Sequence, residues 1–318
     1  MLFGFNVHTG GPLANKQNIE KIVKHGEKLG FSLLTVPDHI VFPRTINSKY
    51  PYGSDGSLSA STACADGNWF EPLTLLSYLA AITDRIKLLP AVLVIPNRPP
   101  ILAAKTISSI DALSNGRVIV GCGTGWLEEE FITVSAPPFK DRGKVTDEYI
   151  KIYKELWTKD EPSFNGNYAN LSNIHFAPRP AQVPHPPIWI GGEGPLAIKR
   201  AVKLGNGWFP VGCNAKHPLD TPEHLKKGIE RLNSYRKEQG NNDEPFDIAY
   251  WAAWYGGKSP TGNKDTFFSG PYEDTIKDIK FMKELGVTHL VLNFVRDCIN
   301  QCLDDMENFH NEIMPFFK

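Results

Sequence analysis

Residues 114–126, Ser-Asn-Gly-Arg-Val-Ile-Val-Gly-Cys-Gly-Thr-Gly-Trp, decide the fold of this chain. The Asn-Gly pair is a turn signal, and the largely apolar, β-branched run over 117–120 predicts a short buried strand. Gly121, Gly123 and Gly125 alternate past that run. Because glycine has no Cβ, this spacing admits a neighbouring backbone or a flat ligand, although a tight strand–helix turn would use the same residues. A strand that ends in glycines and an aromatic residue indicates the mouth of a parallel α/β protein.

These glycines do not fit the dinucleotide-binding fingerprint G-x-G-x-x-G. That fingerprint opens a helix and is followed by a second strand with an acidic residue for the ribose. Here position 126 is Trp, and residues 127–140 contain Pro137-Pro138 and no second strand pattern. A dinucleotide-binding fold is therefore disfavoured.

On both sides of this strand, strand patterns alternate with helix patterns. Helix boundaries have clear signals, because Gly30 and Gly286 stop two helices, and Thr221 is an N-cap followed by Pro222. The predicted strands cover 2–7, 31–36, 86–95, 117–120, 188–190, 207–211, 246–251 and 288–294, and the predicted helices cover 18–29, 71–83, 99–114, 145–158, 195–204, 221–239, 272–285 and 303–314.

Eight strands and eight helices in strict alternation are typical of a (β/α)8 TIM barrel in the α/β class. We expect a single domain over residues 1–318 with long insertions, at 42–68, 159–187 and 254–270. The first and third insertions follow strands, and loops after strands lie at the carboxyl face, where barrel active sites are found. Irregular loops of this length are usually functional or disordered.

Composition excludes several classes of partner. The chain has 318 residues, 41% of them hydrophobic, and a formal net charge of -1, so electrostatics give no case for nucleic acid or an anionic membrane. No apolar run reaches membrane-spanning length, and the first seven residues lack a signal-peptide pattern. The five cysteines complete no zinc site, so we expect no metal and a cytoplasmic protein with reduced thiols. They are Cys64, Cys122, Cys213, Cys298 and Cys302.

Asp38 and His39 follow the second predicted strand and are the candidate catalytic residues. A histidine at this face can exchange hydrogen bonds with a bound ring, and it titrates near neutrality. The alternative is a histidine bonded to a loop carbonyl, and an aspartate in this place can also cap the loop. We expect His39 to be the principal catalytic group.

The turn Gly191-Gly192-Glu193-Gly194-Pro195 places backbone N–H groups ahead of a helix. Such a turn suits an anion, above all phosphate, although a plain strand–helix connection has the same form. Further residues at or just past strand ends are expected to form an apolar, aromatic pocket for a flat cofactor, unless they only pack in the barrel core. They are Phe5, Asn6, Val94, Ile95, Gly123, Thr124, Trp126, Trp251 and Asn293.

The sequence lacks the motifs of two other classes of enzyme, metallohydrolase barrels and serine hydrolases. A metallohydrolase barrel needs His-x-His at the end of its first strand, where this chain has Asn6-Val7-His8 with a single histidine. A serine hydrolase of the α/β type needs a G-x-S-x-G elbow, which the sequence does not contain.

A series of segments resembles the luciferase-like family of flavin- and deazaflavin-dependent oxidoreductases. The segments occur in the family's order over most of the chain, and the resemblance fades after about Gly212. They are Val-Pro-Asp-His at 36–39, Glu-Pro-Leu-Thr-Leu-Leu at 71–76, Ile-Thr-Asp-Arg-Ile-Lys-Leu at 82–88, Ala-Lys-Thr-Ile-Ser-Ser-Ile-Asp-Ala-Leu-Ser-Asn-Gly-Arg-Val at 104–118, Gly-Cys-Gly-Thr-Gly-Trp at 121–126, Ala-Pro-Arg-Pro-Ala-Gln at 177–182 and Pro-Pro-Ile-Trp-Ile-Gly-Gly at 186–192.

The resemblance implies a (β/α)8 barrel, usually a homodimer, that binds a flavin-type ring at its carboxyl face. The resemblance is strongest to the branch that uses the deazaflavin coenzyme F-420, in which the histidine that matches His39 lies by the reacting ring carbon. It also implies a non-proline cis peptide behind the ring, near Val94-Ile95. Some deazaflavin dehydrogenases have a glutamate where this chain has Trp126, and this departure argues against sugar-phosphate dehydrogenase activity.

We therefore expect an enzyme that transfers a hydride between F-420 and a small organic substrate. An FMN-dependent monooxygenase, in which reduced flavin meets oxygen in a dry pocket, is the first alternative. The second is a non-catalytic flavin-binding relative, which would have a filled pocket or lack the polar group beside the ring. The presence of His39 argues against that alternative, and the variable loops carry no readable code for the substrate.

Overall fold

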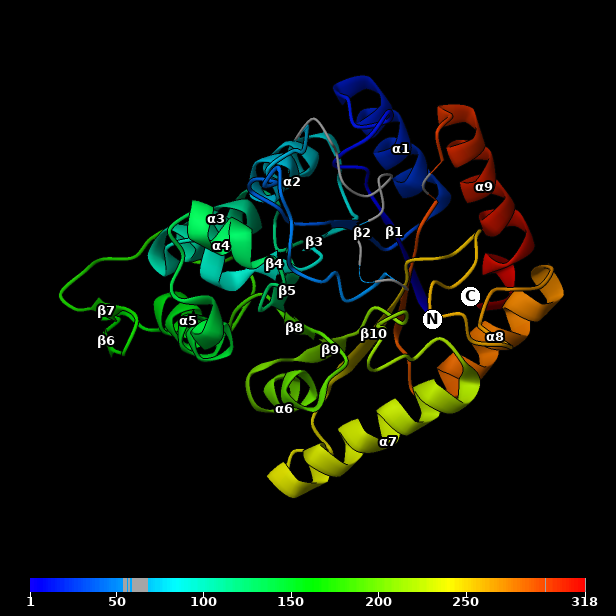
Figure 1. Ribbon diagram of the computed structural model, residues 1–318. Helices are drawn as coiled ribbons and strands as arrows, with labels where there is room; N and C mark the ends of the chain where they lie inside the picture. The colour runs from blue at the N-terminus through cyan, green and yellow to red at the C-terminus, as the bar shows by residue number, and fades with distance from the viewer. Residues whose placement is uncertain (54–55, 57, 59–67, 295, 318) are drawn as a thin grey trace.

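The computed structural model describes residues 1–53, 56, 58, 68–294 and 296–317, and a parallel β-barrel forms its centre (Figure 1). The barrel strands are β1 (Leu2–Asn6), β2 (Leu33–Val36), β3 (Lys87–Pro90), β4 (Leu93–Val94), β5 (Val120–Gly123), β8 (Ile188–Gly191), β9 (Gly207–Phe209), β10 (Asp247–Ala252) and β11 (His289–Leu292).

These segments follow the order β3-β2-β1-β11-β10-β9-β8-β5-β4, and they pair in parallel throughout. Leu88 of β3 also pairs with Val118, just before β5, and this bridge closes the sheet. Because β3 and β4 are two parts of one interrupted strand, the barrel has eight strand positions. The predicted (β/α)8 barrel is confirmed.

Helices surround the barrel (Figure 1). They are α1 (Lys16–Leu29), α2 (Pro72–Ile82), α3 (Pro100–Leu113), α4 (Glu128–Thr133), α5 (Arg142–Thr158), α6 (Pro195–Leu204), α7 (Pro222–Gln239), α8 (Tyr272–Glu284) and α9 (Ile299–Glu312), with 3-10 turns η1 (Ile95–Asn97), η2 (Phe139–Asp141) and η3 (Met314–Phe317).

The predicted helix boundaries hold where a capping residue marks them. The Thr221 side chain accepts a hydrogen bond from the His224 N–H, and Gly30 ends α1 with a φ of 86°. Where no side-chain cap is present, the prediction is less accurate: α9 begins at Ile299 rather than at residue 303, and in its first turn only Cys302 is buried. Helix α4 was not predicted as a separate element.

Two apolar cores divide the side chains of each strand. The inner core fills the barrel, and the outer core lies between the strands and the helices. Phe5 belongs to the outer core: it is fully buried, its ring centroid is 5.3 Å from that of Phe31, and it lies directly against Gly26 of α1. The structure therefore corrects the expectation that Phe5 binds a cofactor. The inner core consists of Leu33, Leu89, Ala91, Ile119, Trp189, Phe209, Ala249 and Val291.

The glycine run makes room for the neighbouring strand of the barrel. A Cβ on Gly121 would overlap the Pro90 carbonyl oxygen, and one on Gly123 would overlap Val92. A Cβ on Gly191, across the mouth on β8, would lie 2.8 Å from the same valine. Of the two uses expected for these glycines, close approach of a backbone and its side chain is therefore the one that the structure shows.

Two details of this region differ from expectation. Strand β5 covers 120–123 rather than 117–120, because its ladder with β8 begins only at the pair Val120 and Ile188. The non-proline cis peptide bond joins Ala91 to Val92, where β3 gives way to β4, and not the expected Val94-Ile95.

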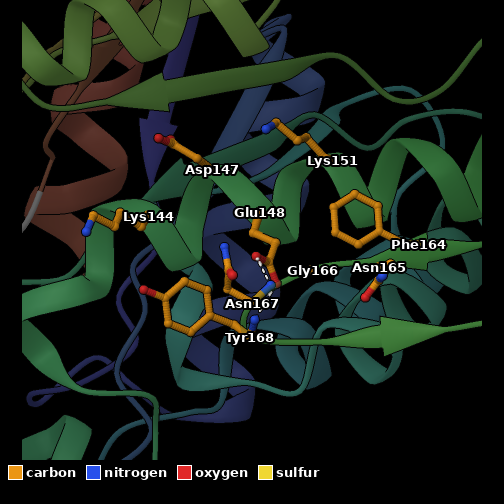
Figure 2. A pocket seen from close by; sticks show the side chains of 9 residues that line it. All are labelled: Lys144, Asp147, Glu148, Lys151, Phe164, Asn165, Gly166, Asn167 and Tyr168. Carbon is orange, nitrogen blue, oxygen red and sulfur yellow. Dashed lines mark hydrogen bonds between the residues drawn. The ribbon is translucent and has the colours of Figure 1, made fainter.

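The insertion at 159–187 was predicted to be irregular but contains a short hairpin, β6 (Phe164–Asn165) and β7 (Asn170–Leu171). Its turn is held by the Glu148 carboxylate of α5, which accepts backbone N–H bonds from Asn167 (2.8 Å), Tyr168 (2.8 Å) and Ala169 (2.9 Å). An open cavity of about 380 Å³ lies between this hairpin and α5, and Figure 2 shows the side chains that line it. It lies on the outer flank of the molecule, so it is not the barrel mouth.

The described cysteines, Cys122, Cys213, Cys298 and Cys302, are free thiols, whereas Cys64 lies outside the described residues. Part of the insertion predicted at 42–68 also lies outside them. Among the described helices, none combines the length and apolar character needed to cross a membrane.

Candidate active site

The parallel strands bring most of the predicted site residues to one end of the barrel. The segments 37–39, 94–95, 124–126 and 192–194 all lie at or just past the carboxyl ends of their strands, β2, β4, β5 and β8. Segments at the carboxyl ends of parallel strands share one face, so the predicted mouth is present.

His39 lies among aromatic rings at this mouth. Its imidazole centroid is 4.4 Å from that of Phe42, 5.7 Å from that of Trp69 and 6.0 Å from that of Trp126. The imidazole side chain is 12% exposed, so it is shielded but not sealed from a ligand. The predicted residues His39 and Trp126 are thus neighbours, and the planes of their rings are roughly perpendicular.

Glu130 of α4 fixes the orientation of His39. Its Oε2 lies 3.1 Å from His39 Nδ1, and its Oε1 accepts backbone N–H bonds from Ile40 (2.6 Å) and Val41 (3.2 Å). The Glu130 side chain is 1% exposed. Because a carboxylate can only accept, this bond selects the tautomer with hydrogen on Nδ1 and leaves Nε2 as the nitrogen that can meet a ligand.

The loop after β2 is attached to α4 at a second point. Glu129 Oε1 accepts N–H bonds from Asn47 (2.6 Å) and Ser48 (3.0 Å), and its Oε2 accepts the Ser48 hydroxyl hydrogen (2.7 Å). Farther along the loop, the Tyr50 ring packs on Trp126 with centroids 5.1 Å apart. Helix α4 therefore serves to hold the β2 loop over the barrel mouth.

Asp38 is fully engaged by protein groups. Its carboxylate accepts the Val94 N–H (2.7 Å) and two hydrogen bonds from the Arg98 guanidinium (2.7 and 2.8 Å). Arg98 also binds Glu71, the N-cap of α2 (2.8 Å). Burial lowers the pKa of Arg98, but Asp38 and Glu71 raise it by more, so the guanidinium stays charged. The structure therefore gives Asp38 a positioning role, joining β2 to Val94 and η1.

Polar side chains from β1, β10 and β11 face the inside of the mouth. Asn6 accepts the Thr35 hydroxyl hydrogen (3.1 Å), and Asn293 donates its amide hydrogen to the Ala253 carbonyl (3.0 Å). Trp251 packs on the inner core. Asn293 Oδ1 and Trp251 Nε1 are buried and have no partner among the described residues. Asn293 and Trp251 thus offer one acceptor and one donor to a ligand.

Of the remaining predicted residues, some contribute through their backbone and others are buried in the core. Ile95 is fully buried in the outer core, and Val94 is engaged through its N–H. A Cβ on Gly125, whose φ is +79°, would lie 2.7 Å from Val94 Cγ1, so the turn around Thr124 packs tightly on β4. The structure brings Thr124 and Gly123 to the mouth but gives Ile95 no exposed surface there.

The turn after β8 leads into α6 as expected. Gly194 is the N-cap, and Gly192 has a φ of +105°, a conformation that favours glycine. Glu193, however, points away from solvent: it is 2% exposed, its Oε1 accepts the Val211 N–H (2.6 Å), and its Oε2 lies 3.4 Å from the Tyr52 hydroxyl. Its carboxyl group holds the β2 loop and the segment after β9, and is not presented to an anion.

The sequence comparisons identify the family. A family model described as luciferase-like monooxygenase matches residues 1–260. The chain belongs to the luciferase-like monooxygenase family. An uncharacterised protein of Mycobacterium tuberculosis is 32% identical over 274 residues, which cover 86% of this chain and 83% of that protein. The FMNH(2)-dependent dimethylsulfone monooxygenase of Pseudomonas putida is 33% identical over 147 residues, which cover 46% of this chain and 40% of that enzyme.

The fold agrees with this family. The coenzyme F-420-dependent tetrahydromethanopterin reductase of Methanopyrus kandleri superposes with a TM-score of 0.75 at 17% identity, over 100% of this chain and 99% of that chain. By its family, this luciferase-like protein is a flavin- or deazaflavin-dependent oxidoreductase. A protein similar to it in sequence depends on reduced FMN, and one similar to it in fold depends on coenzyme F-420.

Several functional groups of this luciferase-like barrel were missed in the sequence. Glu130 and Arg98 act on His39 and Asp38 from more than fifty residues away, and spacing alone does not show such contacts. One signal was available for Glu130: it ends a run of three acidic residues, 128–130, that opens a helix two residues after Trp126. Tyr50 and Tyr52 lie in an insertion without periodicity, so no pattern marked them.

The buried Glu193 predicts a pH effect on stability. Burial raises its pKa to about 8, although the Val211 N–H and Asn214 lower it. The pKa of a glutamate in an unfolded chain is about 4.3, so between this pH and about 8 only the folded protein holds the proton. The stability that comes from the neutral carboxyl is fully present below the unfolded pKa and is lost as the pH rises through about 8.

We therefore expect Glu193→Gln, which does not titrate, to raise the melting temperature relative to wild type by an amount that grows from pH 5 to pH 9. Differential scanning fluorimetry across that range measures it. The exposed Glu161→Gln is the matched control, and its difference from wild type should stay constant with pH. A constant difference for Glu193→Gln as well would show that this carboxyl does not titrate in the range.

Proposed function

We propose that this protein transfers a hydride between the deazaflavin coenzyme F-420 and a small organic substrate. The observation that supports this most is His39, held at the barrel mouth by the buried Glu130 with Nε2 left for a ligand. The segment Val-Pro-Asp-His at 36–39 and the glycine run resemble the F-420 branch of the family. We propose a cytoplasmic protein with one domain over residues 1–318.

The residues at the mouth fit a flavin-type ring. Such a ring has a polar edge with carbonyl and N–H groups, and the buried Trp251 Nε1 and Asn293 Oδ1 offer the complementary donor and acceptor. The cofactor phosphate fits the N-terminus of α6, where a Cβ on Gly194 would meet only His217, at 3.5 Å. Asn6, Thr124 and Trp126 complete the lining.

When bound, the deazaflavin supplies the two-electron chemistry as a hydride donor or acceptor at one ring carbon. His39 exchanges the accompanying proton at Nε2, because Glu130 keeps hydrogen on Nδ1. Trp126, Phe42 and Trp69 exclude water around the imidazole. Asp38 does not enter the reaction and keeps the backbone of β4 in place.

Separate titrations with F-420 and with FMN test this proposal. We expect purified protein to change the absorbance of F-420 at micromolar concentrations and to bind FMN more weakly. Tight FMN binding without F-420 binding would favour the FMN-dependent monooxygenase, which the 33% identity to an FMNH(2)-dependent monooxygenase also supports. Binding of neither compound would contradict both functions.

A variant of the α6 turn tests the phosphate site. Gly192 is unsuitable because its positive φ would strain any side chain, whereas Gly194 has a φ of -72°. We expect Gly194→Val to weaken binding of the cofactor at least ~10-fold, about the worth of one to two charge-assisted hydrogen bonds, with an unchanged melting temperature. The affinity for riboflavin, which has the FMN ring without phosphate, should change little. Equal losses for FMN and riboflavin would place the phosphate elsewhere.

We also propose a homodimer that buries one face of α2 and α3. The exposed residues on these helices are all uncharged: Thr74, Ser77 and Ala81 on α2, and Ile101, Leu102 and Leu113 on α3. Leu102 is 61% exposed and Leu113 is 82% exposed, which is costly for an apolar surface in water. Sedimentation velocity should give the mass of two chains, and a monomer at micromolar concentration would contradict the dimer.

A further inference from the structure

His8 is a buried histidine whose ring nitrogens are both unpaired. It is 6% exposed, and neither Nδ1 nor Nε2 has a partner among the described residues. The Val7 N–H continues the pairing of β1 with β2 by donating to the Thr35 carbonyl (2.8 Å), while the Val7 side chain lies in the outer core. Because side chains alternate along extended backbone, His8 points to the other side, into the barrel mouth with Asn6.

The segment that follows His8 lies against Trp69. The Thr9 carbonyl accepts the Phe70 N–H (3.1 Å), and Gly10 forms an antiparallel bridge with Trp69. The Trp69 ring is in turn a neighbour of His39, with centroids 5.7 Å apart. The Trp69 indole Nε1 is also buried without a partner in the described part of the chain. His8, Trp69 and His39 thus occupy adjoining positions on the β1 and β2 side of the mouth.

These unpaired groups are uncharged. Burial and, to a smaller extent, the positive charge of Arg296 lower the pKa of His8 to about 4, so the ring is neutral at pH 7. It then offers one N–H donor and one nitrogen acceptor, and Trp69 adds a second donor. A buried polar group without a partner destabilises the folded protein, and native proteins rarely keep one without a reason. A metal does not supply the reason, because the described residues hold no cluster of three His, Cys, Asp or Glu.

We propose that His8 and Trp69 form a subsite for an uncharged oxygen function of the substrate, a hydroxyl or a carbonyl, beside His39. This inference rests on the proposed function, because it names the substrate class of the same mouth. A hydroxyl or carbonyl oxygen accepts from the two N–H groups, and a hydroxyl also donates to the free imidazole nitrogen. The subsite offers no cation of its own to a carboxylate or phosphate, since Arg296 is paired with Asp305 at 2.6 Å.

The test uses three small probes of one shape on cofactor-free protein: cyclopentanol, cyclopentanone and the oxygen-free cyclopentane. The ring nitrogens of His8 are followed by 15N NMR and assigned as the resonances that disappear in His8→Phe. We expect both oxygen-bearing probes to shift the His8 resonances and cyclopentane to leave them unmoved. His8 resonances that ignore cyclopentanol and cyclopentanone would overturn the subsite.

Variants give a second measurement. His8→Phe and Trp69→Phe should each weaken cyclopentanol binding by about 3–10-fold, the worth of one hydrogen bond, and the exposed His175→Gln is the matched control. Undiminished binding by both folded variants would also overturn the proposal. If Trp69→Phe fails to fold, the NMR titration decides alone, and if His8→Phe fails to fold, His8→Gln supplies the assignment for that titration.

The experiments distinguish a failure of the proposed function from a failure of the His8 subsite. If neither F-420 nor FMN binds while cyclopentanol shifts His8, the proposed function is wrong and the subsite stands. If a cofactor binds and His8 does not respond to either oxygen-bearing probe, the function stands and the subsite is wrong. His8→Phe should leave the cofactor affinity unchanged, because the residues proposed to hold the cofactor are Trp251, Asn293 and the α6 turn.

Discussion

Replacing His39 with alanine is expected to lower turnover by about 10²–10⁴-fold while leaving the affinity for the cofactor nearly unchanged. The His39 imidazole lies at the mouth and is held there by the buried Glu130. A loss of this size corresponds to roughly 3–5 kcal/mol in the activation free energy, which is typical of general acid–base catalysis. Turnover is followed by cofactor absorbance over a panel of small alcohols and carbonyl compounds. The melting temperature is measured on the same samples.

The competing explanation is a structural histidine. It predicts a lower melting temperature for His39→Ala with near-normal turnover per folded molecule. A variant that keeps full activity would remove His39 from the mechanism and leave the mouth without an identified acid or base.

Glu130→Gln tests the same site while keeping the His39 imidazole in place. Ile40 and Val41 require an acceptor, so the amide oxygen is expected to stay with them and the amide NH2 to face His39 Nδ1. That arrangement forces hydrogen onto Nε2 and removes the free nitrogen, so we expect turnover to fall ~10²-fold or more. The 15N shifts of His39 report the change of tautomer, which a merely structural glutamate would not cause. Glu129→Gln is the matched control, because Glu129 holds the same loop through Asn47 and Ser48 without touching His39.

The barrel was predictable because its signals are local. Strand and helix periodicity, the caps at Thr221 and Gly30, and the glycine run each depend on a few neighbouring residues. The position of His39 at the mouth followed from the same reasoning, since the carboxyl ends of parallel strands meet at one face. Family motifs added the cofactor class but not the substrate.

What the sequence could not show depends on contacts between distant residues. Phe5 and Asn6 both end β1, and only the alternation of the strand, fixed by its pairing, puts Phe5 in the outer core and Asn6 in the mouth. Glu193 sits in a turn that suits phosphate, yet its carboxyl is buried against Val211 and Tyr52. Asp38 resembled a catalytic acid until Arg98, sixty residues later in the chain, was seen to occupy both of its oxygens.

The ion pair of Asp38 with Arg98 leads to the largest expected loss of stability. The Asp38 side chain is fully buried and that of Arg98 is 10% exposed. Removal of one partner leaves the other charge buried, which typically costs about 3–5 kcal/mol. Arg98 also joins the N-terminus of α2 through Glu71, so its loss releases both the segment after β2 that carries His39 and the start of α2.

We expect Arg98→Met, which keeps the length and the apolar stem of the side chain, to lower the free energy of unfolding by about 3–5 kcal/mol in urea titrations. The matched control is Arg179→Met, whose partner Asp160 is 94% exposed, and its loss should stay below ~1 kcal/mol. Asp38→Asn should also destabilise the protein, because its amide NH2 would face either the Val94 N–H or the guanidinium. A small loss for Arg98→Met, similar to that of Arg179→Met, would mean that the Asp38 carboxyl does not need its partner. It would then be free to take part in the chemistry of the mouth, and the positioning role given to Asp38 would be wrong.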